Sequence, residues 1–132
     1  MQPVLSFHVE GRLSEAEAAV RAALLEVGFG ILTEVNVTAT LQNKLGIATK
    51  PYKILGACNP KIAHRALEAD PRGGAFLPCG IALYEEEDGK TTVCLQDPAL
   101  IAETFHTEGL AEAAAEARER LEAALHRVGS AA

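Results

Sequence analysis

The sequence contains no tryptophan, five per cent aromatic residues and three cysteines in 132 residues. So few aromatic side chains leave few platforms on which nucleic-acid bases could stack. The formal net charge of −6 also opposes a phosphate backbone, so we expect no nucleic-acid partner. An odd number of cysteines in a chain of this length is not typical of a secreted disulfide scaffold, and we expect reduced thiols.

Long apolar runs are missing as well. No stretch approaches the roughly 18 apolar residues of a membrane span, and the first residues lack the layout of a secretory signal. We therefore expect a cytoplasmic protein with no membrane partner. The motifs GxGxxG, GxxxxGK[ST], GxSxG and HExxH are absent, so nucleotide, serine-hydrolase and zinc-protease sites have no support and no cofactor is expected.

What the chain does have is 48% apolar residues, enough for one core, and we expect a single domain over residues 1–132. Period-two patterns predict strands near 4–9, 29–37, 52–58, 75–86 and 91–96, and helical patterns lie between and after them. The order β-α-β-α-β-α-β-β-α predicts an α+β fold, a mixed sheet of about five strands with helices on one or both faces. The last four residues, "GSAA", are expected to be disordered.

Helix boundaries carry the clearest local signals. Ser14 and Glu17 form a capping-box pattern for the first helix, and Gly28 suits its C-terminal end. Thr38 is placed to cap a short helix, and Asn59 followed by a proline is a strong start signal for another. The final helix, 107–128, has one apolar side, made of the following residues: Leu110, Ala114, Ala117, Leu121, Leu125 and Val128.

Charge is unevenly distributed. Between Lys44 and Arg72, six basic residues stand against two acidic ones, a local balance of +4 that leaves −10 for the rest of the chain. A basic segment in an acidic protein can bind a small anion while the whole molecule repels polyanions. The alternative is that these lysines and arginines only solvate the surface.

The segments "LGACNPKIAHRAL", "FLPCG" and "YEEEDGK", together with "GFGILTEVNVTATLQNKLG", cover much of the chain. In these segments the sequence resembles the domain-of-unknown-function 302 family of bacteria and archaea. The resemblance implies a compact α+β domain and a homodimer, and it supplies no established reaction. The abundance of Arg, Glu and Ala with only three asparagines also suits a thermophile.

Cys58 directly precedes the Asn59 cap, where the positive end of a helix and Lys61 lower a thiol's pKa and make it a better nucleophile. The same backbone N–H groups could instead hold a phosphate or carboxylate, with Lys61, Lys53 and Arg65 as additional cations. In the third interpretation Asn59 only caps the helix and Cys58 packs as a small apolar side chain.

Cys79 follows a proline and shares the parity of core-facing strand residues. If its strand and that of Cys58 were parallel neighbours, the two cysteines would be out of register, so a resting disulfide is not expected. A metal site would need Cys58, Cys79 and a histidine such as His64, but the short ligand spacing of zinc sites is missing and no metal is expected.

Three hypotheses follow. The first is a small dimeric module that binds an anionic ligand at the helix starting at Asn59; its expected ligand-binding residues are Asn59, Lys61, Lys53, Arg65 and Cys79. The second is a thiol-based enzyme, or a redox or metal sensor, that uses Cys58 with Cys79; whether the protein is an enzyme stays open. The third is a structural role through a dimer face on the final helix.

Overall fold

The computed structural model describes residues 3–132 as a six-stranded sheet with helices. The strands lie in the order β2-β3-β4-β5-β1-β6, and every neighbouring pair is antiparallel. Their bounds are β1 Val4–Val9, β2 Gly30–Asn36, β3 Tyr52–Cys58, β4 Cys79–Glu85, β5 Thr91–Gln96 and β6 Gly129–Ala131. The α+β class is confirmed. The sheet is antiparallel rather than mixed, and the sixth strand is the segment that was expected to be disordered: Gly129–Ala131 pairs with β1.

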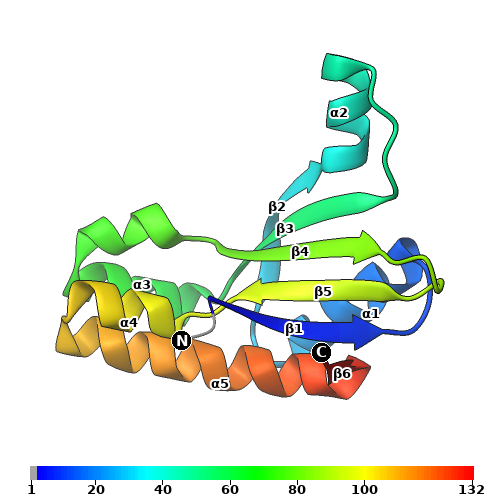
Figure 1. The fold of residues 1–132 in the computed structure, drawn as a ribbon. Coiled ribbons are helices and arrows are strands. Elements are labelled where there is room, and N and C mark those ends of the chain that lie inside the picture. Colours follow the sequence, from blue (N-terminus) through cyan, green and yellow to red (C-terminus); the bar gives the residue numbers. More distant parts are fainter. Residues whose placement is uncertain (1–2) are drawn as a thin grey trace.

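The helices that build the core are α1 (Leu13–Glu26), α3 (Pro60–Ala69), α4 (Ala99–Phe105) and α5 (Glu108–Val128), with a 3-10 helix, η1 (Pro71–Phe76), after α3. Helix α5 contacts α1, α3 and α4, and Figure 1 shows it running along the strands with α3 and α4 beside one end. Its predicted stripe is buried against the protein's own core, except for the half-buried Val128. The stripe is therefore not available as a dimer face, and that hypothesis about α5 was wrong.

Two predicted helix caps are corrected. Helix α1 begins after Arg12 rather than at Ser14, because Glu15 Oε1 accepts a hydrogen bond from Arg12 N at 3.2 Å and Glu85 Oε2 accepts one from Leu13 N at 3.0 Å. Gly28 ends the same helix in the left-handed region, with φ of 88°, as predicted. Glu17 is then free to make a different contact, described below.

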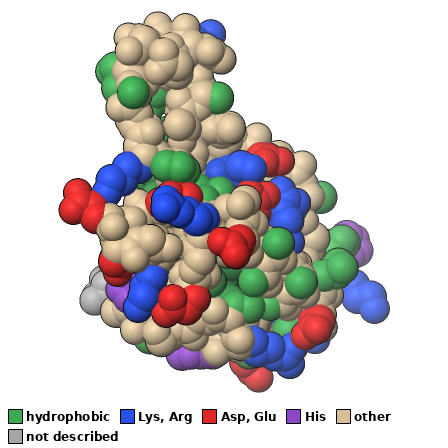
Figure 2. Space-filling model, turned by 90° about the vertical axis from the view of Figure 1, so that its right-hand side faces the viewer, with side chains coloured by type: hydrophobic (Ala, Val, Ile, Leu, Met, Phe, Trp, Pro, Cys, Tyr) green, Lys and Arg blue, Asp and Glu red, His purple; other side chains and the backbone are tan. Residues whose placement is uncertain are grey.

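The short helix α2 (Val37–Leu45) begins after Asn36, whose Oδ1 accepts from Ala39 N at 3.0 Å, and not at Thr38. Thr38 Oγ1 instead accepts a hydrogen bond from Tyr52 N at 2.7 Å and so fixes α2 to the start of β3. None of the nine residues of α2 is buried. In Figures 1 and 2 this helix stands away from the body at the end of β2 and β3, and we call residues 37–51 the arm.

The core lies between the helices and one face of the sheet. Alternate strand residues on that face have almost no solvent exposure: Phe7, Leu55, Ile81, Leu83, Val93 and Leu95. Within residues 3–132, no helix combines the length and the apolar composition that crossing a membrane would require.

Candidate functional site

The start of α3 is built as the sequence predicts. Asn59 is the N-cap and is only 9% exposed, and its Oδ1 accepts hydrogen bonds from Lys61 N at 3.1 Å and Ile62 N at 3.2 Å. Ala63 N donates to Asn59 O at 2.9 Å, and Pro60 has no N–H to offer. The backbone donors of this first turn are therefore used within the protein, which corrects the expectation that they hold an anion directly.

The other half of the Asn59 amide is oriented differently. Because Oδ1 must accept from two backbone N–H groups, the amide orientation is fixed, and Nδ2 lies beside Gly28: a Cβ added to Gly28 would be 2.8 Å from it. Among residues 3–132 no hydrogen-bond partner is found for Nδ2. Because no buried side-chain nitrogen or oxygen in the described range lacks a partner, Nδ2 is reached by solvent, and Asn59 keeps a free N–H donor group at the turn between α1 and β2.

Asn59 and Gly28 form part of the wall of an open groove of about 520 Å³ between the start of α3 and helix α5. The remaining lining residues are Pro60, Lys61, Ile62, Arg65, Glu116 and Arg120. Three of these side chains are cationic and one is a carboxylate. The groove is therefore positively charged in an acidic protein.

The charges of the groove are arranged around Glu116. Arg65 Nη1 lies 2.6 Å from Glu116 Oε1, and Arg120 Nε lies 3.1 Å from Glu116 Oε2. The hydrogen bond from Arg65 is the main reason why the pKa of Glu116 lies below its ordinary value. Arg120 Nη1 also donates to Val27 O at 3.2 Å, which ties α5 to the end of α1. Lys61 forms no ion pair with any residue in the described range, so its charge is uncompensated.

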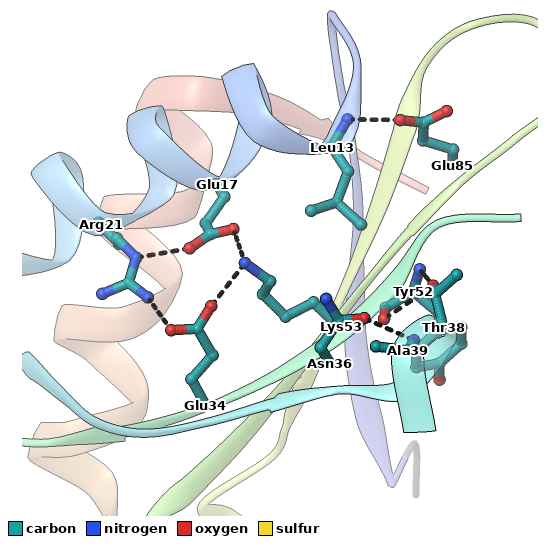
Figure 3. A network of polar contacts seen from close by, with 10 residues as sticks. All are labelled: Leu13, Glu17, Arg21, Glu34, Asn36, Thr38, Ala39, Tyr52, Lys53 and Glu85. Atoms are coloured by element: carbon teal, nitrogen blue, oxygen red, sulfur yellow. Dashed lines mark hydrogen bonds and ion pairs between the residues drawn. The ribbon is translucent and has the colours of Figure 1, made fainter. Parts of the chain in front are cut away.

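Lys53 does not belong to this groove. It lies near the start of β3, five residues before Cys58, where Nζ contacts Glu17 Oε1 at 2.8 Å and also pairs with Glu34 (Figure 3). The hydrogen bond to Glu17 is the main cause of a raised Lys53 pKa. With both carboxylates bound to it, Lys53 joins β2, β3 and α1 and has no free charge for a ligand at Asn59.

The two cysteines of the predicted site do come together, although not as expected. Strands β3 and β4 are antiparallel, with Ala57 opposite Cys79, so the parallel register considered from the sequence is wrong. Cys58 and Cys79 line one apolar cavity of about 40 Å³ under α3, and both are free thiols. Most of the remaining lining residues come from α3, α4 and α5, and Phe29, Ala57 and Leu77 also contribute.

The cavity has the opposite effect on the thiols from the one expected at a helix N-terminus. Burial raises the pKa of Cys58 above its ordinary value. Burial, together with the nearby Cys58, raises the pKa of Cys79 to about 11. Asn59 already uses the backbone donors that would stabilise a thiolate, so both sulfurs stay protonated at neutral pH.

His64 lies on the exposed side of α3, where Nε2 is 3.0 Å from Glu68 Oε1. It is not among the residues that line the cavity with Cys58 and Cys79. Across residues 3–132, no cluster of three or more histidine, cysteine or carboxylate side chains is placed to hold a metal ion.

Sequence reasoning identified Asn59, Lys61 and Arg65 but missed Gly28 and the α5 side of the groove. Glu116 and Arg120 are four residues apart in α5, a spacing that allows an ion pair on one helix face, and the pair exists at 3.1 Å. Nothing in the sequence said that α5 lies beside α3, because that contact depends on how the helices pack on the sheet. Gly28 was predicted for its backbone conformation only, not for its closeness to Asn59.

Comparison with known proteins gives a family and no activity. The family model described as "Domain of unknown function DUF302" matches residues 5–128. No curated protein matches the chain. A solved structure, described as the crystal structure of an uncharacterized conserved protein DUF302 from Bacillus stearothermophilus, shares 32% sequence identity. It aligns with a TM-score of 0.88 over 97% of this chain and 99% of that one. The chain therefore belongs to the DUF302 family.

Proposed function

We propose that the protein binds a small anion, with a phosphate or carboxylate group, in the groove between α3 and α5. The observation that carries this proposal is the solvent-accessible Nδ2 donor of Asn59, which has no partner within the described residues, at the wall of a groove in which three cations face one carboxylate. An anion there would accept a hydrogen bond from Asn59 and gain charge attraction from Lys61 without breaking any contact within the protein.

The arginines of the groove have a second part in this proposal. Arg65 and Arg120 share Glu116, so each guanidinium keeps N–H groups that a single carboxylate does not use. Such groups are suited to the planar oxygens of a carboxylate or to two oxygens of a phosphate. The ligand would therefore be small, since the groove is open and its polar groups lie close to one end of α3.

The thiol hypothesis has less support. A nucleophilic or metal-binding cysteine needs a low pKa and access, whereas burial raises the pKa of both Cys58 and Cys79. The homodimer implied by the family resemblance remains part of our proposal, and the surface that would form it is argued separately below.

Titration with inorganic phosphate, followed by two-dimensional NMR, tests the site. We expect saturable shifts at the amides of Gly28 and Lys61 and at the side-chain NH2 of Asn59. Lys61→Glu replaces an uncompensated cation with an anion and is expected to weaken binding at least about tenfold. Lys90→Gln removes a lysine that pairs with Glu10, away from the groove, and serves as the control.

Three results would contradict the proposal. The first is no saturable shift with phosphate or with a small carboxylate such as citrate. The second is equal binding by Lys61→Glu and the unchanged protein. The third is an equal loss in Lys90→Gln, which would show that only the total charge matters.

A further inference from the structure

The sheet has a second face, and its residues follow from the strand register. One row across the sheet contains Val35, Ile54, Ala82, Cys94 and Ser6. The next row contains Tyr52, Tyr84, Thr92 and His8, and a third contains Thr33, Gly56 and Gly80. We call these three rows the open face. They alternate with the buried rows that meet the helices, so they point away from the core.

The open face retains solvent contact in the single chain. Ile54 is 38% exposed and Val35 is 47% exposed, while Cys94, Ala82 and both tyrosines are half-buried. The rings of Tyr52 and Tyr84 stack with centroids 5.2 Å apart, and Tyr84 OH lies 3.6 Å from Cys94 Sγ. These contacts join β3, β4 and β5 into an ordered surface.

The composition of the open face is unusual for a face in water. None of its twelve residues is a lysine, arginine, aspartate or glutamate. The carboxylate that reaches it is Glu86, beyond the end of β4, which accepts from Thr92 Oγ1 at 2.7 Å. A solvated sheet face normally carries charged and polar side chains, whereas the cores of protein interfaces are poor in charge and rich in tyrosine.

We infer that the open face packs against the same face of a second copy of this chain. Charge restricts where a second copy can approach. Each chain carries −6, so two copies repel each other over most of their surface, and the uncharged open face is where they can meet with no like charges opposed. Two sheets packed face to face in this way form a two-fold symmetric sandwich with a spacing of about 10 Å.

The available area is close to what a stable dimer needs. Five strands about 4.8 Å apart and about 24 Å long give a flat area of roughly 580 Å², and the uneven surface of real side chains is larger. A stable interface buries about 800 Å² on each partner. The arm continues from β2 and adds Leu45 and Ile47, which are 65% and 47% exposed in the single chain. The flat area of the sheet face is therefore most of what such an interface needs, and Leu45 and Ile47 are further exposed apolar side chains of the same chain.

The relief of the open face also suits a second copy. Gly80 and Ala82 form a low strip along β4 in its middle, with Ile54 and the stacked tyrosines beside it, while Thr33 and Pro78 fill the space above Gly56. Where two such faces meet across a two-fold axis, the larger side chains of one can enter the low strip of the other. Ala82 lies on the middle row of β4, so an axis relating two overlapping faces passes near it.

Light scattering coupled to size-exclusion chromatography, repeated over a range of concentrations, tests this surface. The unchanged protein is expected at twice 13.9 kDa. Ile54→Asp places a carboxylate on each side of the interface, and we expect the dissociation constant to rise roughly 100-fold. Leu25→Asp, on α1 and 70% exposed, makes the same kind of change on the helix side and is expected to leave the dimer intact.

A second pair of variants guards against a folding defect. Ala82→Asp and Ala82→Lys are each expected to be monomeric, and mixing them is expected to restore a dimer because opposite charges then face each other near the axis. Circular dichroism of each variant checks that the single chain remains folded. A defect in folding would not be repaired by mixing.

This proposal rests on the homodimer that is part of the proposed function, but it does not rest on the anion site. Different results would contradict the dimer surface and the anion site. A protein that stays monomeric at millimolar concentration would overturn the dimer and this surface, even if it binds phosphate. A dimer that survives both Ile54→Asp and Ala82→Asp would overturn the surface alone. A monomer that associates only with a different protein would also contradict it.

Discussion

Ile54 and Leu55 are neighbours in β3 with opposite surroundings. Leu55 has no solvent exposure and packs between the sheet and the helices, whereas Ile54 is 38% exposed on the open face. The same alternation runs across the sheet, so each strand contributes to both faces. In a sheet covered on one side, the uncovered positions usually carry charge. Here they do not.

The charge of this part of the sheet is found on the covered side instead. Lys53 shares its row with the buried Leu83 and Val93, and at the edge of the sheet it meets Glu17 and Glu34. The covered face and the open face therefore do not differ simply as an apolar face and a polar face. One is a core closed by an ion pair at its edge, and the other is an uncharged surface suited to another sheet.

The largest difference in stability between the two faces is expected when Leu55 and Ile54 are each shortened to alanine. Leu55→Ala leaves a cavity in a packed core, and we expect it to lower the free energy of unfolding by about 2–5 kcal/mol. Ile54→Ala removes a partly solvated side chain and is expected to cost about 1 kcal/mol or less in the monomer. Urea unfolding at concentrations below the dissociation constant measures both. Equal losses would mean that the open face is covered within the single chain.

A smaller contrast is expected between two glycines that lie opposite each other on the open face. A Cβ at Gly56 would lie 2.5 Å from Pro78 Cγ and 2.2 Å from Thr33 Oγ1, whereas a Cβ at Gly80 meets nothing within 4 Å. Thr33 can rotate away but the proline ring cannot, so we expect Gly56→Ala to destabilise the monomer by about 1–3 kcal/mol. Gly80→Ala is expected to be neutral or slightly stabilising. Thermal unfolding of both variants in dilute solution tests this contrast. A destabilised Gly80→Ala would contradict the pairing of β3 with β4.

Local signals in the sequence predicted much of this fold. The punctuation by Asn59 and Pro60 placed α3, and the period of the apolar residues placed α5 and the strands to within a few residues. Two caps were misassigned because residues from other strands engage the ends of these helices: Glu85 accepts from Leu13 N at α1, and Tyr52 N donates to Thr38 Oγ1, so that Asn36 caps α2. A capping pattern describes only its own few residues.

What the sequence could not provide is pairing over long distances. The antiparallel register of β3 and β4 places Cys58 beside Cys79 in an apolar cavity, and so it reverses the expected effect on the pKa of Cys58. The same limitation applies to Arg120, which reaches the groove only because α5 packs on α3. Each of these depends on which elements become neighbours, and that is a property of the whole chain.

The ion pair at the edge of the covered face predicts a pH-dependent effect. Burial alone would raise the pKa of Glu17, but hydrogen bonds from Lys53 and Arg21 outweigh it, and the pKa lies below 4.5. The contribution of Glu17 to stability is therefore full above pH 4.5 and is lost as the pH falls through its lowered pKa. We expect Glu17→Gln to cost about 1 kcal/mol at neutral pH and nothing below that pKa. Glu112→Gln, an exposed change on α5, should show no such dependence in urea unfolding.

The smallest expected effect is on the ionisation of the Tyr84 hydroxyl on the open face, and it does not concern stability. The hydrogen bond to Cys94 is the main cause that raises the pKa of Tyr84 to about 12, and burial adds to it. Carbon NMR of the Tyr84 ring should show it still protonated at a pH of about 11, where an ordinary tyrosine is mostly ionised. Cys94→Ala should move the pKa of Tyr84 back toward 10, and Cys79→Ala, on the covered face, should leave it unchanged. If Tyr84 titrates alike in all three proteins, Cys94 and Tyr84 do not face each other, and the ordered surface assigned to the open face is wrong at its centre.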